Sequence, residues 1–281
     1  MGTMHNRVAL VTGASTGIGK AIALRLLNEE WVVYAGARRL PLMEDLKAKG
    51  AKVLCLDVTL EESMVAAVNQ VLETEGHIDA LINNAGYGAY GAIENVAIDE
   101  VRRQFEVNVF GLARMSQLVL PAMREAHSGT IVNIGSMGGK FWMPIGGWYH
   151  ATKHVVEVIS DAMRYECAPF GVHVVVVEPG SIKTEWAGIS AQGARTAKLD
   201  SAYRELEDKM ANLLESDGHP ADPDVIAKVV SVALNSPHPR RRYAAPLDAK
   251  ILIFVHWLLP APAWEALIRM AIRRANSKKS G

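Results

Sequence analysis

A glycine-rich turn between a short apolar run and a helical pattern constrains the fold of this chain more than any other feature. The turn reads Gly13-Ala14-Ser15-Thr16-Gly17-Ile18-Gly19 and follows Val8-Ala9-Leu10-Val11. Glycines there permit a tight bend, and the free N–H groups at the start of the following helix can hold a pyrophosphate. An ordinary strand-to-helix turn is the alternative, but the strand–turn–helix context is the one that the motif requires. We therefore predict that a dinucleotide is bound by Gly13, Ser15, Thr16, Gly17, Ile18 and Gly19.

Short apolar runs rich in β-branched residues alternate with longer helical patterns over the first two-thirds of the chain, which is typical of βαβ units. The run 173–178 is nearly continuous in valine, as expected of a strand covered on both faces. The pattern predicts an α/β fold with a Rossmann-type doubly wound parallel sheet, in one domain over residues 1–281. The predicted strands are 7–12, 31–37, 53–56, 80–83, 130–134 and 173–178, and the clearest helices are 18–28, 61–75, 100–124 and 149–168.

The pattern changes after Gly180. Residues 181–199 are small and polar with little periodicity, which predicts a mobile loop, and we expect the region 181–215 to form a substrate loop or lid. Residues 200–215 and 222–235 read as helices, the second with Asp222-Pro223 at its start. The apolar residues of 251–272 predict a helical C-terminal extension over 247–276.

Composition excludes several classes of function. The chain has 30 basic and 30 acidic residues, so there is no electrostatic case for binding nucleic acid. Cys55 and Cys167 have no zinc spacing, and the absence of a signal-peptide pattern makes a cytoplasmic location the expectation. His150 and His154 are one turn apart, yet no third ligand stands out nearby. We predict no metal and a surface or subunit-contact position for the two histidines.

The residues after the second strand favour one nicotinamide cofactor. An acidic residue about 20 positions beyond the glycines would bind the ribose 2′-hydroxyl of NAD, whereas arginine accommodates a 2′-phosphate. The chain has Ala37-Arg38-Arg39-Leu40 there, without a carboxylate. A guanidinium can hold a phosphate by charge-assisted hydrogen bonds. We predict NADP(H), with Arg38 the better candidate and a solvated loop charge as the alternative for either arginine.

Tyr149 and Lys153 are four residues apart, which places both side chains on one face of a helix. A phenol with a pKa near ~10 is a poor acid or base at neutral pH. A neighbouring ammonium favours the phenolate and lowers that pKa, so the pair predicts a general acid/base. Ser136 lies thirteen residues upstream, just after an apolar strand, and a serine that merely ends a strand is the alternative there.

These motifs resemble the single-domain branch of the short-chain dehydrogenase/reductases. The resemblance rests on Thr12-Gly13-x-x-x-Gly17-Ile18-Gly19, Asn83-Asn84-Ala85-Gly86, Ser136, Tyr149-x-x-x-Lys153 and Pro179-Gly180, and covers residues from about 8 to 186. The residue patterns of segments 33–39 and 162–172 look most like those of the hydroxysteroid and retinol dehydrogenase-like group. The family implies an oxidoreductase that interconverts a ketone or aldehyde and an alcohol, with Tyr149 as the general acid/base.

The family also implies roles for single residues. Ser136 would hydrogen-bond the substrate oxygen and stabilise the charge that develops there. Lys153 would hold the nicotinamide ribose, and Asn108 would hold a water that links the lysine to solvent, although an asparagine that satisfies backbone groups is the alternative. Asn83 would bond to neighbouring backbone. The remaining cofactor-binding residues that the resemblance implies are Asp57 and Val58 at the adenine, Asn84, Ala85 and Gly86 under its ribose, Tyr149 and Lys153, and Pro179, Gly180, Ile182 and Thr184 at the nicotinamide.

Aromatic and other large apolar residues cluster around the predicted site and indicate a bulky apolar carbonyl or alcohol substrate, with loop packing as the alternative. They are Tyr87, Tyr90, Phe141, Trp142, Met143, Pro144, Ile145, Trp148 and Trp186.

The tail 251–259 is too short to span a bilayer, which needs about 20 apolar residues, but its basic flanks would suit peripheral contact with an anionic membrane. A lid over the pocket or a subunit interface is the favoured interpretation of this segment, and membrane contact is the alternative. By analogy we expect a homodimer or homotetramer. The rival functions are a regulatory NADP(H)-binding protein and a sugar-nucleotide epimerase or dehydratase.

Overall fold

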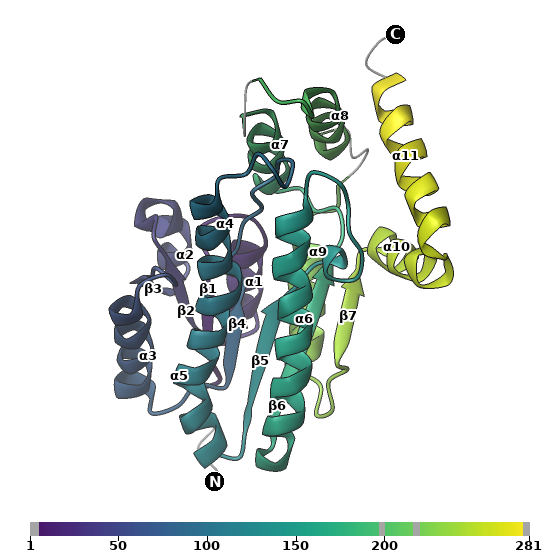
Figure 1. Ribbon diagram of the computed structural model, residues 1–281. Helices are drawn as coiled ribbons and strands as arrows, with labels where there is room; N and C mark the ends of the chain where they lie inside the picture. Colours follow the sequence, from purple (N-terminus) through teal and green to yellow (C-terminus); the bar gives the residue numbers. More distant parts are fainter. Residues whose placement is uncertain (1–5, 197–199, 216–219, 278–281) are drawn as a thin grey trace.

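The computed structural model describes residues 6–196, 200–215 and 220–277 (Figure 1). Seven parallel strands form one sheet in the order β3-β2-β1-β4-β5-β6-β7. The order reverses between β1 and β4, which is the doubly wound arrangement with its switch point at the glycine-rich turn. The strands are β1 Val8–Thr12, β2 Val32–Ala37, β3 Lys52–Cys55, β4 Ala80–Asn83, β5 Gly129–Ile134, β6 Val172–Pro179 and β7 Arg242–Ala245.

Helices cover both faces of the sheet, because alternate residues of each strand point to opposite faces. Ala9 and Val11 of β1 pack with one layer, formed by α1 Gly17–Asn28, α2 Glu44–Ala48 and α9 Asp224–Leu234. Val8 and Leu10 pack with the other, formed by α3 Glu61–Glu75, α5 Leu112–Glu125 and α6 Gly147–Cys167. These two apolar clusters make one domain, as the sequence predicted.

A third apolar cluster lies beyond the carboxyl ends of the strands. Tyr90, Phe141 and Tyr149 pack there with residues of α7 Trp186–Thr196, α8 Arg204–Glu215 and the helices α10 Leu247–Leu258 and α11 Ala261–Ser277. In Figure 1, α7 and α8 stand above the sheet, and α10 and α11 (yellow) stand beyond β7. The C-terminal helices therefore pack on the same end of the sheet as the predicted site.

Three elements differ from the sequence prediction. Strand β7 was not predicted, since its four residues Arg-Tyr-Ala-Ala lack an apolar run. The predicted loop 181–199 contains helix α7, although residues 197–199 lie outside the described part of the chain. The predicted helix 100–124 is divided into α4 Ile98–Phe105, a π-helical segment Glu106–Gly111 and α5.

Candidate active site

The predicted site residues come together at the carboxyl edge of the sheet, because parallel strands end on the same side. Gly13 follows β1, Asn84 follows β4, Ser136 follows β5 and Pro179 ends β6. The glycine-rich turn lies directly against the turn after β4, where the Asn84 side-chain amide donates hydrogen bonds of 3.0 Å to the carbonyl oxygens of Thr12 and Gly13. Two motifs 70 residues apart are thereby locked into one structure.

The glycines of this turn are required by its backbone. Gly13 has φ +65° and Gly17 has φ +55°, values that favour glycine, and a side chain on Gly13 would come within 2.8 Å of the Ala85 backbone. A side chain on Gly19 would lie 2.5 Å from the Gly13 carbonyl oxygen. Thr16 precedes α1 without a side-chain capping bond, so the first N–H groups of the helix face the turn unpaired by a cap. Such a cradle fits a pyrophosphate.

The other predicted cofactor-binding residues line a path along the same edge. Both arginines after β2 are exposed, and the Arg39 guanidinium lies 3.5 Å from the Thr16 hydroxyl and 3.7 Å from the Glu185 carboxylate. Asp57 caps the turn after β3, where its Oδ1 accepts bonds from the Thr59 N–H and hydroxyl. These positions suit the adenosine half of a dinucleotide.

At the opposite end of the path, the residues that follow β6 approach the glycine-rich turn. Thr184 lies against Gly17, Ile182 pairs with Ala221, and Gly180 donates a 2.8 Å hydrogen bond to the carbonyl oxygen of Ala245 in β7. Asp248 of α10 then accepts a 2.8 Å bond from the Ser181 N–H. The stretch expected to bind the nicotinamide is thus fixed by β7 and α10, neither of which carried a recognised motif.

Tyr149, Lys153 and Ser136 are assembled by the first turns of α6 against the end of β5. Tyr149 and Lys153 each expose 7% of their surface. The Lys153 Nζ donates a 2.9 Å hydrogen bond to the Ile134 carbonyl oxygen and lies 6.0 Å from the Tyr149 ring centroid. The Ser136 hydroxyl is hydrogen-bonded to the Tyr149 phenol and accepts a 3.0 Å bond from the Gly138 N–H. The three residue types that proton transfer to a carbonyl needs are therefore together.

The electrostatics of the pair differ from the sequence expectation. Burial raises the pKa of Tyr149 to about 12, and the hydrogen bond from Ser136 opposes this only in part. Burial also lowers the pKa of Lys153 to about 8, against the attraction of Glu157. The expected lowering of the Tyr149 pKa by Lys153 is thus absent in this arrangement, because the ammonium bonds to backbone instead of the phenol. Tyr149 is consequently protonated, and ready to act as an acid, throughout the neutral pH range.

Asn108 lies in the π-helical segment and is 1% exposed. Its side-chain amide makes two hydrogen bonds with the backbone of Tyr87, accepting from the N–H at 3.0 Å and donating to the carbonyl oxygen at 2.8 Å. It also donates to the Thr152 hydroxyl. The side chain thus satisfies backbone, which was the alternative reading. π-Helical segments are frequent at functional sites because they shift backbone groups out of the helical ladder.

Two sequence predictions about neighbouring residues are wrong. Asn83 does not bond mainly to neighbouring backbone, because its amide donates to the side chains of Ser116 at 3.0 Å and Asn133 at 2.9 Å. His150 is not at the surface. It is 4% exposed, its Nδ1 lies 2.8 Å from the Gly138 carbonyl oxygen, and burial lowers its pKa. It supports the Ser136 turn from within, whereas His154 is exposed.

Aromatic rings enclose Tyr149. The Trp186 and Tyr90 ring centroids lie 5.2 Å and 5.7 Å from the Tyr149 centroid, and Trp186 meets Tyr90 edge-on at 5.7 Å. Further out, Phe141 packs on Trp264 of α11 at 5.1 Å. The predicted apolar surroundings of the site are present, and α11 contributes to them.

A buried ion network beside helix α6 was missed by sequence reasoning. Glu157, one turn after Lys153 on the same helix face, pairs with Lys140 at 2.5 Å and with Arg242 of β7 at 2.8 Å. Glu178 lies 3.2 Å from Lys140, and both burial and the nearby Glu157 raise its pKa. The network joins the Ser136 turn, α6, β6 and β7. Only the spacing of Glu157 from Lys153 could have indicated it.

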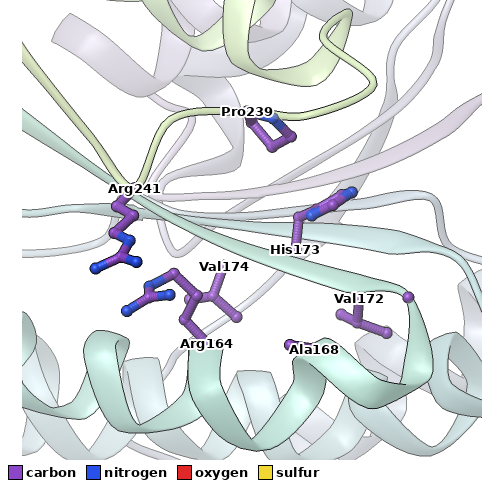
Figure 2. Close-up of a pocket in the computed structure, with 8 residues that line it drawn as sticks. Arg164, Ala168, Val172, His173, Val174, Pro239 and Arg241 are labelled. Carbon is purple, nitrogen blue, oxygen red and sulfur yellow. The ribbon is translucent and has the colours of Figure 1, made fainter.

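A hollow of about 240 Å³ lies at the other end of the sheet (Figure 2). Gly171 and Val172 at the start of β6 line it, together with Arg164, His173, Pro239 and Arg241. Because β6 begins there and ends at Pro179, this hollow is separated from Tyr149 by the length of the strand. It is not part of the candidate active site.

The chain belongs to the short-chain dehydrogenase family, since the family model described as short chain dehydrogenase matches residues 7–194. Among curated relatives, a probable short-chain type dehydrogenase/reductase VdlC of Helicobacter pylori is 33% identical over 94% of this chain and 97% of its own. The NADPH-dependent 3-dehydrocapnine reductase of Ornithobacterium rhinotracheale is 35% identical over 90% and 93%. The 3-ketodihydrosphingosine reductase of Bacteroides thetaiotaomicron is 41% identical over 64% and 66%.

Solved structures give the same family. A short-chain dehydrogenase from Streptomyces avermitilis superposes with a TM-score of 0.82 at 31% identity and covers 99% of this chain and 100% of its own. An actinorhodin polyketide ketoreductase solved with NADPH has a TM-score of 0.73 at 30% identity over 87% and 97% of the two chains. The predicted family and the Rossmann-type fold are confirmed, and the chain is an oxidoreductase of a family that uses a nicotinamide cofactor.

Proposed function

We propose that this oxidoreductase is an NADP(H)-dependent carbonyl reductase, which converts a bulky apolar ketone or aldehyde to its alcohol with Tyr149 as the general acid. The observation that carries the proposal is the buried Tyr149 phenol, hydrogen-bonded to Ser136, enclosed by Trp186 and Tyr90 and one helical turn from Lys153. A protonated phenol among apolar side chains is suited to donating a proton to a carbonyl oxygen.

The roles of the residues follow from their chemistry. A bound reduced nicotinamide supplies a hydride to the carbonyl carbon. Ser136 donates a hydrogen bond to the carbonyl oxygen and stabilises the charge that develops there. Tyr149 gives that oxygen its proton, and the ammonium of Lys153 offsets the charge of the resulting phenolate. Reduction is the proposed direction, an inference from the cellular NADPH pool.

The cofactor preference rests on the loop after β2. Arg38 and Arg39 are both exposed there, and Arg39 lies beside the glycine-rich turn. Two guanidinium groups without a carboxylate at the end of β2 favour the 2′-phosphate of NADP(H). A relative named as NADPH-dependent and a ketoreductase solved with NADPH agree with this preference.

The substrate class is inferred from the aromatic surroundings and from the relatives. Tyr90, Phe141, Trp186 and Trp264 offer an apolar enclosure. Two relatives carry the names of reductases of 3-ketodihydrosphingosine and 3-dehydrocapnine, which favours reduction of a carbonyl substrate. We further propose a cytoplasmic enzyme that forms a homodimer or homotetramer, which light scattering tests.

The test is oxidation of NADPH, with NADH in parallel, against aliphatic, aromatic, steroidal and long-chain acyl ketones. We expect turnover with NADPH, a preference over NADH that falls at least about tenfold in Arg38→Ala, and a loss of turnover of at least about a hundredfold in Tyr149→Phe. Equal use of NADH would overturn the cofactor assignment. Unchanged turnover in Tyr149→Phe would overturn the catalytic assignment.

A further inference from the structure

The outer face of helix α10 carries a continuous apolar strip. Leu247, Ile251, Phe254 and Leu258 follow the i, i+4, i+7, i+11 spacing of one helix face, and Trp257 stands beside them. Each of the five exposes between 51% and 77% of its surface. Val158 of α6 and Val232 of α9 are also exposed, but these two helices cover opposite faces of the sheet. A strip of this kind marks a contact with something apolar.

The inner face of α10 is occupied by the chain itself. Ala249 is fully buried, Leu252 and Val255 pack on the cluster around Tyr149, and the His256 ring meets Trp264 edge-on at 4.8 Å. The helix is therefore apolar on both sides, and its inner contacts fix which side faces outward. Helices that are apolar all round are normally buried on every side.

The charges around the strip are mainly positive. Lys250 is exposed on α10, whereas the acidic residue of that helix, Asp248, is turned inward to the Ser181 N–H. The next helix, α11, adds exposed Arg269, Arg273 and Arg274 and the exposed acid Glu265. Over residues 247–277, which contain both helices, the sequence has four lysine and arginine residues and two carboxylates, in a chain whose net charge is zero. The strip thus sits in a positive region.

The size of the strip favours a lipid surface over a second protein. A helix of 12 residues is about 18 Å long and about 10 Å wide. A stable protein–protein interface needs roughly 800 Å² from each partner. An amphipathic helix that lies in the plane of a bilayer needs only an apolar face with cations beside it, and tryptophan and lysine suit that boundary.

We propose that the outer face of α10 docks on the surface of an anionic lipid bilayer. None of the helices in the described part of the chain could cross a membrane, so the contact is peripheral. The apolar strip enters the boundary between headgroups and acyl chains, and Lys250 pairs with anionic headgroups. Docking places the cluster around Tyr149, on the inner side of the same helix, close to the bilayer, in which apolar molecules dissolve.

The test is flotation of the full chain with vesicles of phosphatidylcholine alone and with added phosphatidylglycerol. We expect binding to the anionic vesicles and at least about a tenfold loss in the double variant Phe254→Ser/Trp257→Ser. Lys250→Gln should weaken binding to anionic vesicles about fivefold and leave the weaker binding to neutral vesicles unchanged. The matched control Tyr165→Ser/Val232→Ser removes exposed apolar groups from α6 and α9 and should float like the native chain.

Turnover of a water-soluble ketone, measured on the same preparations, separates docking from folding and from the proposed activity. Equal turnover in the native chain and the α10 variant shows that the variant is folded. Absence of flotation by the native chain overturns the proposal, as does an α10 variant that floats normally. A dimer that dissociates in the α10 variant, without any vesicle binding, would show instead that the strip joins two copies of the chain.

Discussion

The ring centroid of Trp186 lies 5.2 Å from that of Tyr149, so the first residue of α7 covers the group proposed to transfer the proton. Burial is the main cause of the raised pKa of Tyr149. Trp186→Ala should admit water to the phenol and lower that pKa by about one unit. The alkaline limb of the pH profile of kcat/KM for ketone reduction, where the phenol loses the proton that it must donate, should then move to lower pH. Trp142→Ala removes a half-exposed indole of the neighbouring loop and should leave the limb in place.

Lys153→Met should abolish turnover and stabilise the chain. The folded-state pKa of Lys153 is about 8, below its ordinary value of 10.5, so the folded state binds this proton less well than the unfolded state. This cost is fully present below pH 8 and disappears as the pH rises past 10.5. Replacement by methionine should raise the free energy of unfolding by about 1–3 kcal/mol at pH 7.

Urea unfolding of both proteins at pH 7 and pH 10 checks the sign. The stability difference should shrink at pH 10, where native Lys153 loses its proton in the folded state. A variant less stable than the native chain at pH 7 would mean that the bond from Lys153 to the Ile134 carbonyl oxygen outweighs the cost of burial.

Gly19→Ala should weaken dinucleotide binding and destabilise the chain, because the added methyl group would lie 2.5 Å from the Gly13 carbonyl oxygen and clash with the Asn84 side chain. We expect at least a tenfold rise in the dissociation constant for NADPH, measured by fluorescence titration, which is about 1.4 kcal/mol. Gly188→Ala provides a matched control, since no neighbour lies within 4 Å of the added group. That variant should bind normally and gain up to about 1 kcal/mol in stability from helix propensity.

Glu157→Gln should cost about 3–5 kcal/mol of unfolding free energy, since it removes the carboxylate shared by Lys140 and Arg242 in a buried setting. Asp161→Asn removes the more exposed partner of Arg242 and should cost less than about 1 kcal/mol. Chemical denaturation of the two variants measures the difference. Equal effects would mean that the network contributes through the arginine alone.

The strands of the sheet were predictable because burial on both faces leaves continuous apolar runs, as in β6. Strand β7 escaped prediction for the opposite reason. It lies at the edge of the sheet, its residues Arg242, Tyr243 and Ala244 are only half-buried, and pairing with β6 supplies its order. Helix α7 was likewise unpredictable, since its small residues Ser190, Ala191 and Ala194 pack only once the helix has folded against α8 and the loops.

The parts of the site that belong to sequence motifs were predictable, because a motif indicates both the reactive group and its place in the fold. The glycine-rich turn, Ser136, Tyr149 and Lys153 meet as expected. The sequence could not show that Asn108 would bond to the backbone of Tyr87, that His150 would be buried behind Gly138, or that Lys153 would bond to Ile134 and leave the phenol protonated. Each of these depends on which groups the fold places within hydrogen-bonding distance of a side chain, and spacing along the chain does not contain that information.

The match to the family ends at residue 194, whereas Trp264 and Ile268, which complete the apolar enclosure beyond Phe141, come from α11. Asp248 of α10 in turn fastens the loop after β6. The residues proposed for proton transfer and the outer part of the apolar enclosure thus lie in different stretches of the chain. A relative that keeps the first stretch and exchanges the second would perform the same chemistry on another molecule, so exchange of the C-terminal helices between relatives is a direct route to altered selectivity.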